Sequence, residues 1–126
     1  MLRGHYHPLR ENPYVDIVAG FDPGPANPEF DLPRISEEEI FADTSIDAVV
    51  VFFLDRFHTD ALDRSVSAGK SALVDKPLAD TTRDAGRLRI LLADASHEGL
   101  VVSSCHPRRF DPPYLWLKDN LKDFTD

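Results

Sequence analysis

Residues 71–77 read Ser-Ala-Leu-Val-Asp-Lys-Pro, and this stretch indicates the fold most directly. Its run Ala72-Leu73-Val74 is apolar without alternation, which is typical of a parallel strand covered on both faces. Lys76 follows where the strand should emerge, and Pro77 favours an extended backbone there. Ligands of open α/β sheets bind beyond the carboxyl ends of the strands, so Lys76 is a candidate proton donor or fixed positive charge. A plain surface lysine is the alternative.

Other apolar runs predict three more strands. Residues 47–54, Asp-Ala-Val-Val-Val-Phe-Phe-Leu, have the strongest pattern and predict a central, buried strand. Residues 15–22 predict a strand that ends in an acid, and residues 100–104 predict the last one. The four prolines within 23–35 predict an irregular loop.

Helical segments are expected between and after these strands. Ser36 and Glu39 form a capping box that begins a helix over 37–42. A further helix is capped by Thr81 or Thr82, and its apolar positions recur at helical spacing. The remaining expectations are helices over 59–68 and 113–122, stops at Gly69 and Gly99, and a core-facing stripe of Ala85, Leu88, Leu92 and Ala95.

Strands that alternate with helices through short loops predict a parallel α/β sheet with right-handed crossovers. The chain has 126 residues, which suffices for one domain with a core but not for two. Fourteen Lys+Arg against 22 Asp+Glu give a net charge of −8, which argues against a nucleic acid or an anionic membrane as partner. Because Cys105 is the only cysteine and neither a signal peptide nor a transmembrane run is evident, we expect a cytoplasmic protein.

The order of motifs resembles the nucleotide-binding half of the glucose–fructose oxidoreductase / inositol dehydrogenase / rhizopine-catabolism (Gfo/Idh/MocA) family. The resemblance covers about residues 3–122. Its carriers are Arg3-Gly4-His5-Tyr6-His7, Val18-Ala19-Gly20-Phe21-Asp22, Ile46-Asp47-Ala48-Val49-Val50-Val51, His58, Ala68-Gly69-Lys70, Asp75-Lys76-Pro77 and Arg108-Arg109-Phe110-Asp111-Pro112. The resemblance implies a Rossmann-like fold over 1–110, a helix over 111–126 that crosses toward a C-terminal substrate domain, and hydride transfer between a nicotinamide and a sugar or polyol carbon.

The resemblance also assigns roles to single residues. Gly4 would be the last glycine of the dinucleotide fingerprint, and Asp22, 18 residues later, would bind the adenosine ribose hydroxyls. An acid at that position favours NAD over NADP. Lys76 would be the catalytic residue that assists proton transfer, and Arg109 would border the substrate cleft. The other residues implied in cofactor binding are His7, His58, Asp75 and Pro77.

Two departures from the family pattern stand out. The residues before Gly4 hold neither the first strand nor the two earlier fingerprint glycines, so the backbone cradle for the pyrophosphate is absent from this chain. The chain also stops where the substrate domain would begin, so the family's catalytic histidine has no counterpart. We therefore expect the 126-residue chain to bind NAD weakly or not at all and to turn over no sugar alcohol.

The missing strand has a consequence for packing. In the order 3-2-1-4-5-6 it would separate strands 15–22 and 47–54, leaving a gap of roughly 9–10 Å with unpaired backbone. Either these two strands pair directly, or another chain donates a strand, or the fragment does not fold by itself. The apolar residues of helix 113–122 need either the remaining sheet or a partner to cover them. Unpaired edges and an uncovered apolar helix face favour self-association, so we expect a homodimer, or a larger even assembly, that buries Trp116 or the edge of 15–22.

The alternative to an oxidoreductase domain is a non-catalytic binding or dimerisation module with the same fold. No metal is expected, because His5 and His7, taken with His58 or His106, have no clear carboxylate partner. Cys105 is interpreted as a structural thiol rather than a nucleophile. Ser103 and Ser104 are interpreted as strand-end residues, since no nucleophile elbow surrounds them.

Overall fold

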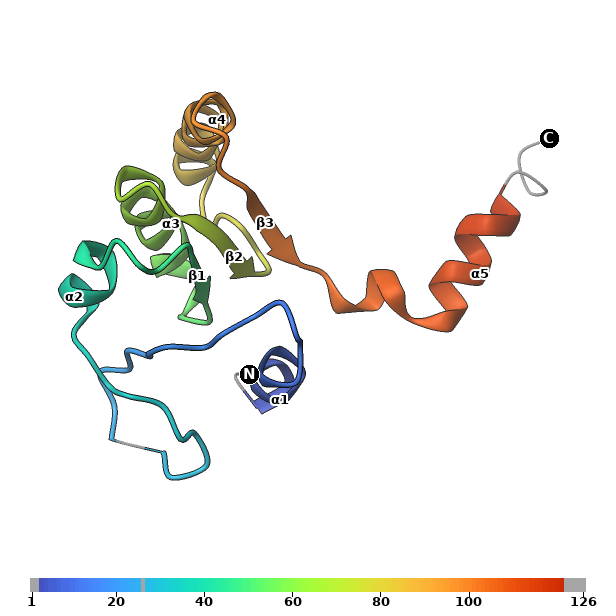
Figure 1. The fold of residues 1–126 in the computed structure, drawn as a ribbon. Helices are drawn as coiled ribbons and strands as arrows, with labels where there is room; N and C mark the ends of the chain where they lie inside the picture. The colour runs from blue at the N-terminus through green and yellow to red at the C-terminus, as the bar shows by residue number, and fades with distance from the viewer. Residues whose placement is uncertain (1–2, 26, 122–126) are drawn as a thin grey trace.

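The computed structural model describes residues 3–25 and 27–121 (Figure 1). Two short 3-10 segments, Asp55–Phe57 and Pro107–Phe110, accompany the regular elements. In chain order these are α1 (Arg3–Arg10), α2 (Glu37–Ala42), β1 (Ala48–Val51), α3 (His58–Ser67), β2 (Ser71–Asp75), α4 (Thr82–His97), β3 (Val102–Cys105) and α5 (Pro112–Asn120).

The strands form a three-stranded parallel sheet in the order β1-β2-β3. Its register aligns Val50 with Leu73 and Leu73 with Ser103. The predicted parallel α/β fold is thus confirmed, although β1 is shorter than the predicted 47–54. Beyond Val51 the chain leaves the ladder, and the Phe52 ring stacks on His5 of α1 at 4.8 Å between ring centroids.

The predicted helix ends are confirmed where a cap or a glycine determined them. Ser36 and Glu39 form the full capping box of α2, and the Thr81 side chain accepts from the Asp84 amide to begin α4. Gly69 and Gly99 follow α3 and α4 with φ of 69° and 75°, the left-handed region in which glycine carries no Cβ penalty.

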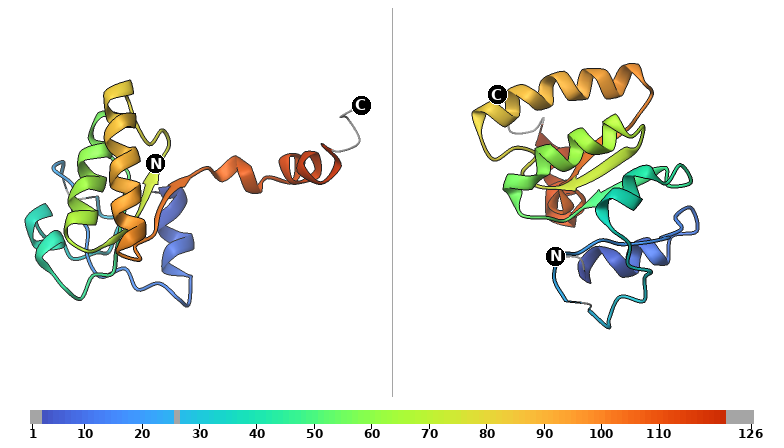
Figure 2. Two further views of the ribbon diagram at one scale, coloured as in Figure 1. Left: turned by 90° about the horizontal axis from the view of Figure 1, so that it is seen from above. Right: turned by 90° about the vertical axis from the view of Figure 1, so that its left-hand side faces the viewer.

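Helices α3 and α4 cover one face of the sheet, as Figures 1 and 2 show. The opposite face is partly open, because Val50 remains 40% exposed. The expectation of a central, buried strand over 47–54 is therefore wrong, because β1 lies at the edge of the sheet and β2 is the central strand. On α4 the buried residues are Leu88, Leu91 and Ala95, whereas Ala85 and Leu92 are exposed. The predicted stripe was thus rotated on the helix. The core consists of Val51, Ala61, Leu62, Val66, Ala72, Val74, Leu88, Leu91 and Ala95.

Residues 15–22 do not form the predicted strand. Among the described residues they contribute only an isolated parallel bridge, Gly20 with Arg34, and β1 pairs with β2 alone. Direct pairing of 15–22 with 47–54 is therefore not formed. Without a neighbouring ladder an extended segment cannot satisfy its backbone groups as a strand does. Instead α1 packs on this side of the molecule, where Tyr6 is buried with its ring edge-on to Phe30.

Helix α5 projects away from the rest of the molecule (Figures 1 and 2). It lies within the predicted range 113–122 apart from its first residue, Pro112, and residue 122 falls outside the described residues. Among the described helices, none combines the length and apolar character needed to cross a bilayer. The exposed apolar side chains on and next to α5 are Phe110, Tyr114, Leu115, Trp116, Leu117 and Leu121.

Candidate functional site

The carboxyl ends of the strands meet the first turns of α1, and this edge is the candidate site. His5 in α1 stacks on Phe52, which follows β1, and its Nε2 lies 4.0 Å from Sγ of Cys105, the last residue of β3. The N-terminal part of α1 therefore lies at the carboxyl edge of the sheet. In α/β folds this is where a helix N-terminus can present backbone N–H groups to an anion.

His58 connects the ends of two strands. It has no exposed surface, and its Nδ1 lies 2.6 Å from the Pro77 carbonyl oxygen while Nε2 lies 3.1 Å from the Phe53 carbonyl oxygen. Both ring nitrogens are directed at backbone carbonyls below the surface, and His58 thereby fixes the segment that follows β2. The cofactor-binding role that the family resemblance implies for His58 stays a prediction.

Lys76 occupies the predicted place just beyond β2. Its side chain is exposed, and its backbone N–H donates to Oδ1 of the buried Asp75 at 2.8 Å. The Lys76–Pro77 peptide bond is cis, and Pro77 accepts from His58 as described. The turn that carries Lys76 is thus held on one side by Asp75 and on the other by His58, so the ammonium extends from an ordered backbone.

Asp22 lies in an exposed loop two residues beyond the Gly20 bridge. Its Oδ1 accepts from the Gly24 amide at 2.7 Å, as in an Asx turn. The Arg34 guanidinium donates through Nη2 to the carbonyl oxygens of Asp22, at 2.5 Å, and of Gly24, at 2.8 Å. The Asp22 carboxylate is therefore built into a turn that a second, distant side chain holds.

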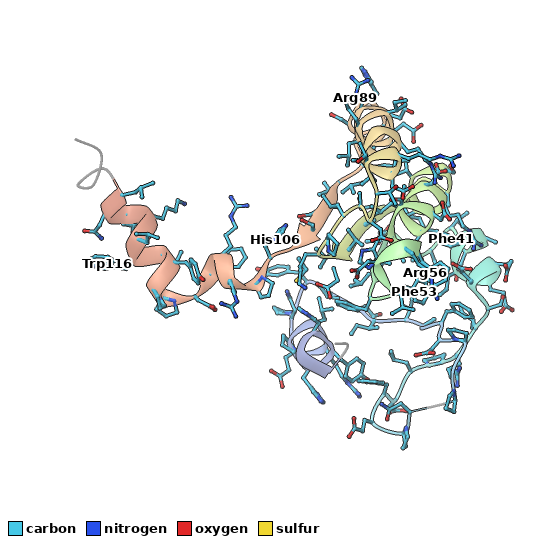
Figure 3. All side chains as sticks on the ribbon, turned by 180° about the vertical axis from the view of Figure 1, so that it is seen from behind. Phe41, Phe53, Arg56, Arg89, His106 and Trp116 are labelled. Carbon is cyan, nitrogen blue, oxygen red and sulfur yellow. The ribbon has the colours of Figure 1, made fainter. Side chains whose placement is uncertain are left out.

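An apolar cleft of about 270 Å³ opens beside Asp22. Phe21 and Pro23 on either side of Asp22 line it, and the Phe21 ring meets Phe53 edge-on at 6.2 Å. Figure 3 shows Phe53 and Arg56 on the same side of the molecule as Phe41. The cleft can accept a flat, apolar ring system against aromatic side chains. Its lining residues are Phe21, Pro23, Glu37, Phe53, Phe57, Asp60, Ala61 and Arg64.

The other predicted residues are spread more widely. Gly4 lies in the first turn of α1, and His7 is exposed on the same helix with its ring edge-on to Tyr6. Arg109 is exposed in the 3-10 segment after β3, on the way to α5. We call the 3-10 segment and α5 together the C-terminal arm (residues 107–120). In Figure 3, His106 lies where this arm begins, and Trp116 on the arm lies far from Phe53. Arg109 therefore lies on the C-terminal arm and does not line the cleft beside Phe21.

Cys105 behaves as a structural thiol. Partial burial and then the negative charge of Asp75 raise the pKa of its thiol above the usual value of 9.0. A raised pKa lowers the thiolate fraction, which is the nucleophilic form. Across residues 3–25 and 27–121, no cluster of three or more His, Cys, Asp or Glu side chains is arranged to hold a metal ion.

Sequence reasoning missed Arg34, which shapes the site, and Lys70, which holds the opposite, amino-terminal end of the sheet. Arg34 went unnoticed because its partners are backbone carbonyls 10 and 12 residues away. Lys70 was noted only as part of a motif, but it is 2% exposed and its Nζ donates to the carbonyl oxygens of Asp43 and Ile46. A lysine placed directly before a buried strand was the available signal for Lys70.

The family is shown by comparison with known proteins. The sequence profile described as "Oxidoreductase family, NAD-binding Rossmann fold" (GFO_IDH_MocA) matches residues 3–104, the segment whose strand ends and loops form the site described above. The chain belongs to the Gfo/Idh/MocA oxidoreductase family. It corresponds to part of the NAD-binding Rossmann domain of that family.

Curated relatives agree with this assignment. Inositol 2-dehydrogenase 1 of Saccharopolyspora erythraea is 38% identical over 83 residues, covering 66% of this chain and 24% of the relative. Inositol 2-dehydrogenase of Acidothermus cellulolyticus is 33% identical over 115 residues, covering 86% and 33%. The structure of myo-inositol 2-dehydrogenase from Lactobacillus plantarum superposes with a TM-score of 0.81 at 20% identity, covering 96% and 37%, which shows the shared fold. The chain thus spans about a quarter to a third of the curated relatives' length.

Proposed function

We propose that this chain is the nucleotide-binding domain of an NAD-dependent oxidoreductase that transfers hydride to or from a sugar or polyol carbon. The observation that carries the proposal is an aromatic cleft lined by Phe21 and Pro23, the two residues on either side of Asp22, at the edge where α/β folds bind ligands. The names of the inositol dehydrogenases among the relatives support a polyol as the substrate class.

The residues present fit the adenosine end of the cofactor. At about 270 Å³ the cleft is slightly below the usual size of a pocket for a whole small ligand, but it suits one flat ring system. Phe21, Phe53 and Phe57 would contact the adenine. Asp22 would then accept hydrogen bonds from the ribose hydroxyls, and a 2′-phosphate would meet its negative charge, so NAD is favoured over NADP.

The remaining residues have roles along the carboxyl edge of the sheet. Gly4 and His7, in α1, would lie near the pyrophosphate. When bound, the nicotinamide supplies the hydride acceptor or donor. Lys76 would hold or release the proton of the substrate hydroxyl at Nζ, while Asp75 and His58 keep its turn in place. Arg109 would face the substrate side, and residues 111–126 would lead toward a substrate domain.

Titration of ¹⁵N-labelled protein with NAD, followed by NMR, tests the proposal. We expect chemical-shift changes that saturate at millimolar NAD and concentrate in residues 21–24 and 53–57. Asp22→Asn should reduce them, whereas Asp94→Asn, at an exposed carboxylate on α4, should not. Shifts confined to α4, or equal effects of the two variants, would refute the adenosine assignment.

A non-catalytic binding or dimerisation module is the second candidate, and the exposed apolar residues of α5 favour it. This alternative requires no nucleotide contact at the cleft. If residues 21–24 and 53–57 respond to neither NAD nor 5′-AMP, which has no pyrophosphate, while the chain associates with rising concentration, the module is supported over the oxidoreductase domain.

A further inference from the structure

Arg34 makes contacts that the functions described so far do not use. Its Nη2 donates to two carbonyl oxygens, those of Asp22 at 2.5 Å and Gly24 at 2.8 Å. These two carbonyls belong to the residue that would bind ribose and to the glycine that hydrogen-bonds its carboxylate. A single guanidinium therefore bridges both ends of the turn that presents the Asp22 side chain.

The loop is also held farther along, where the Tyr6 hydroxyl donates to the Asp31 carbonyl oxygen at 3.5 Å and the Tyr6 ring meets Phe30 edge-on. Its backbone joins the neighbouring segment through one bridge, in which Gly20 N–H donates to Pro33 O and Ile35 N–H donates to Gly20 O. Several prolines between 23 and 33 remove backbone donors, and the described residues of this stretch form no helix or strand. The charge-assisted hydrogen bonds of Arg34 thus hold the Asp22–Gly24 end of this loop, and Tyr6 holds its other end.

The geometry at Gly24 shows how tightly the carboxylate is set. A Cβ at residue 24 would approach Oδ1 of Asp22 to 3.0 Å, closer than ordinary contacts, so the carboxylate would have to shift. The Gly24 hydrogen bond engages Oδ1. Oδ2, which forms no hydrogen bond with the described residues, is left to accept from a ribose hydroxyl.

We propose that Arg34 is a positioning residue for cofactor choice: by holding the Asp22–Gly24 turn it presents the Asp22 carboxylate to the adenosine ribose and favours NAD over NADP. This inference rests on the proposed function. Arg34 acts here through backbone carbonyls and not through the nucleotide. A direct contact of Arg34 with a 2′-phosphate would have the opposite effect, because the guanidinium would then favour NADP.

The test compares Arg34→Met with Arg34→Lys, and uses Arg89→Met on the exposed face of α4 as the matched control. The first measurement needs no nucleotide: NMR reports the solvent-exchange rate of the Gly24 amide. We expect Arg34→Met to raise this rate several-fold, Arg34→Lys to raise it less, and Arg89→Met to leave it unchanged. An unchanged Gly24 rate in Arg34→Met overturns the positioning role.

The second measurement uses the two adenosine probes 5′-AMP and adenosine 2′,5′-bisphosphate, titrated into each variant. Arg34→Met should weaken 5′-AMP binding by about five- to tenfold, as expected for a lost charge-assisted interaction, and should lower the preference over the bisphosphate. Gly24→Ala should also weaken 5′-AMP binding, because its Cβ would displace the Asp22 carboxylate although Arg34 is unchanged. If Arg34→Met weakens only the bisphosphate, Arg34 contacts the 2′-phosphate and the proposal is wrong.

The two proposals can fail separately. If the wild-type chain binds neither probe while its Gly24 amide is protected by Arg34, the nucleotide function is wrong, and the cofactor role of Arg34 is wrong with it. If the wild type binds 5′-AMP and Arg34→Met binds it equally well, the nucleotide function stands and only the role of Arg34 is overturned.

Discussion

Replacing His58 by leucine tests whether the turn behind Lys76 depends on a buried histidine. Leucine is similar in volume, so the main change is the loss of the ring nitrogens that contact the carbonyls of Pro77 and Phe53. A neutral imidazole donates one hydrogen bond, and a buried acceptor left without a donor costs about 1–3 kcal/mol. We therefore expect about 2 kcal/mol of destabilisation, or roughly 5–10 °C in Tm for a domain of this size.

Thermal and urea unfolding followed by far-UV circular dichroism measure this loss. His106→Leu is the matched control, because the His106 side chain is exposed after β3 and its replacement should leave Tm nearly unchanged. In ¹⁵N spectra, His58→Leu should also move the resonances of residues 76–78, which lie behind the lost contact. Equal Tm values for the two variants, or an unperturbed Lys76 amide, would refute the assignment of His58 as the residue that holds this turn.

Three further predictions concern the whole chain. Calorimetry should detect at most weak NAD binding to the 126-residue protein, because two fingerprint glycines are absent from it; a micromolar dissociation constant would contradict this. Sedimentation should show a dimer that Trp116→Ser weakens and that Ile90→Ser, at an exposed residue of α4, does not; a monomer at all concentrations would reject self-association. Alkylation of Cys105 at mildly alkaline pH should be slower than that of an unfolded thiol, because the raised pKa leaves less thiolate, and should accelerate as pH rises. Asp75→Asn removes the negative charge that contributes to this shift and should therefore speed the alkylation; a slower reaction would contradict the charge effect.

Features of the fold that depend on neighbouring residues were predictable from the sequence. The capping box at Ser36 and the glycines at 69 and 99 act through backbone geometry within a few residues, and each determined a helix end as predicted. The continuous apolar runs at β1 and β2 also indicated parallel strands, because such runs lie within a few neighbouring residues. The strand predicted over 15–22 failed, because a strand also needs a partner, and sequence alone does not show whether that partner is present.

Contacts between distant residues limited the prediction of the site. On α4, Leu91 faces the core and Leu92 does not. The rotation of this helix about its axis is set by packing on α3 and the sheet, which the spacing of apolar residues alone does not reveal. The burial of His58 and the role of Arg34 both depend on backbone carbonyls, which every residue carries and no motif marks. The position of Lys76 was predictable because a strand end and a proline define it locally.

The projecting α5 gives this protein a built-in optical reporter. Trp116 is the only tryptophan in the chain, and it is 59% exposed on a helix that contributes nothing to the buried core. In the folded monomer its fluorescence should therefore be red-shifted and readily quenched by iodide, and it should change little when the sheet of the monomer melts. A blue shift of the Trp116 emission with rising protein concentration would report that α5 becomes covered, independently of whether the nucleotide site is formed.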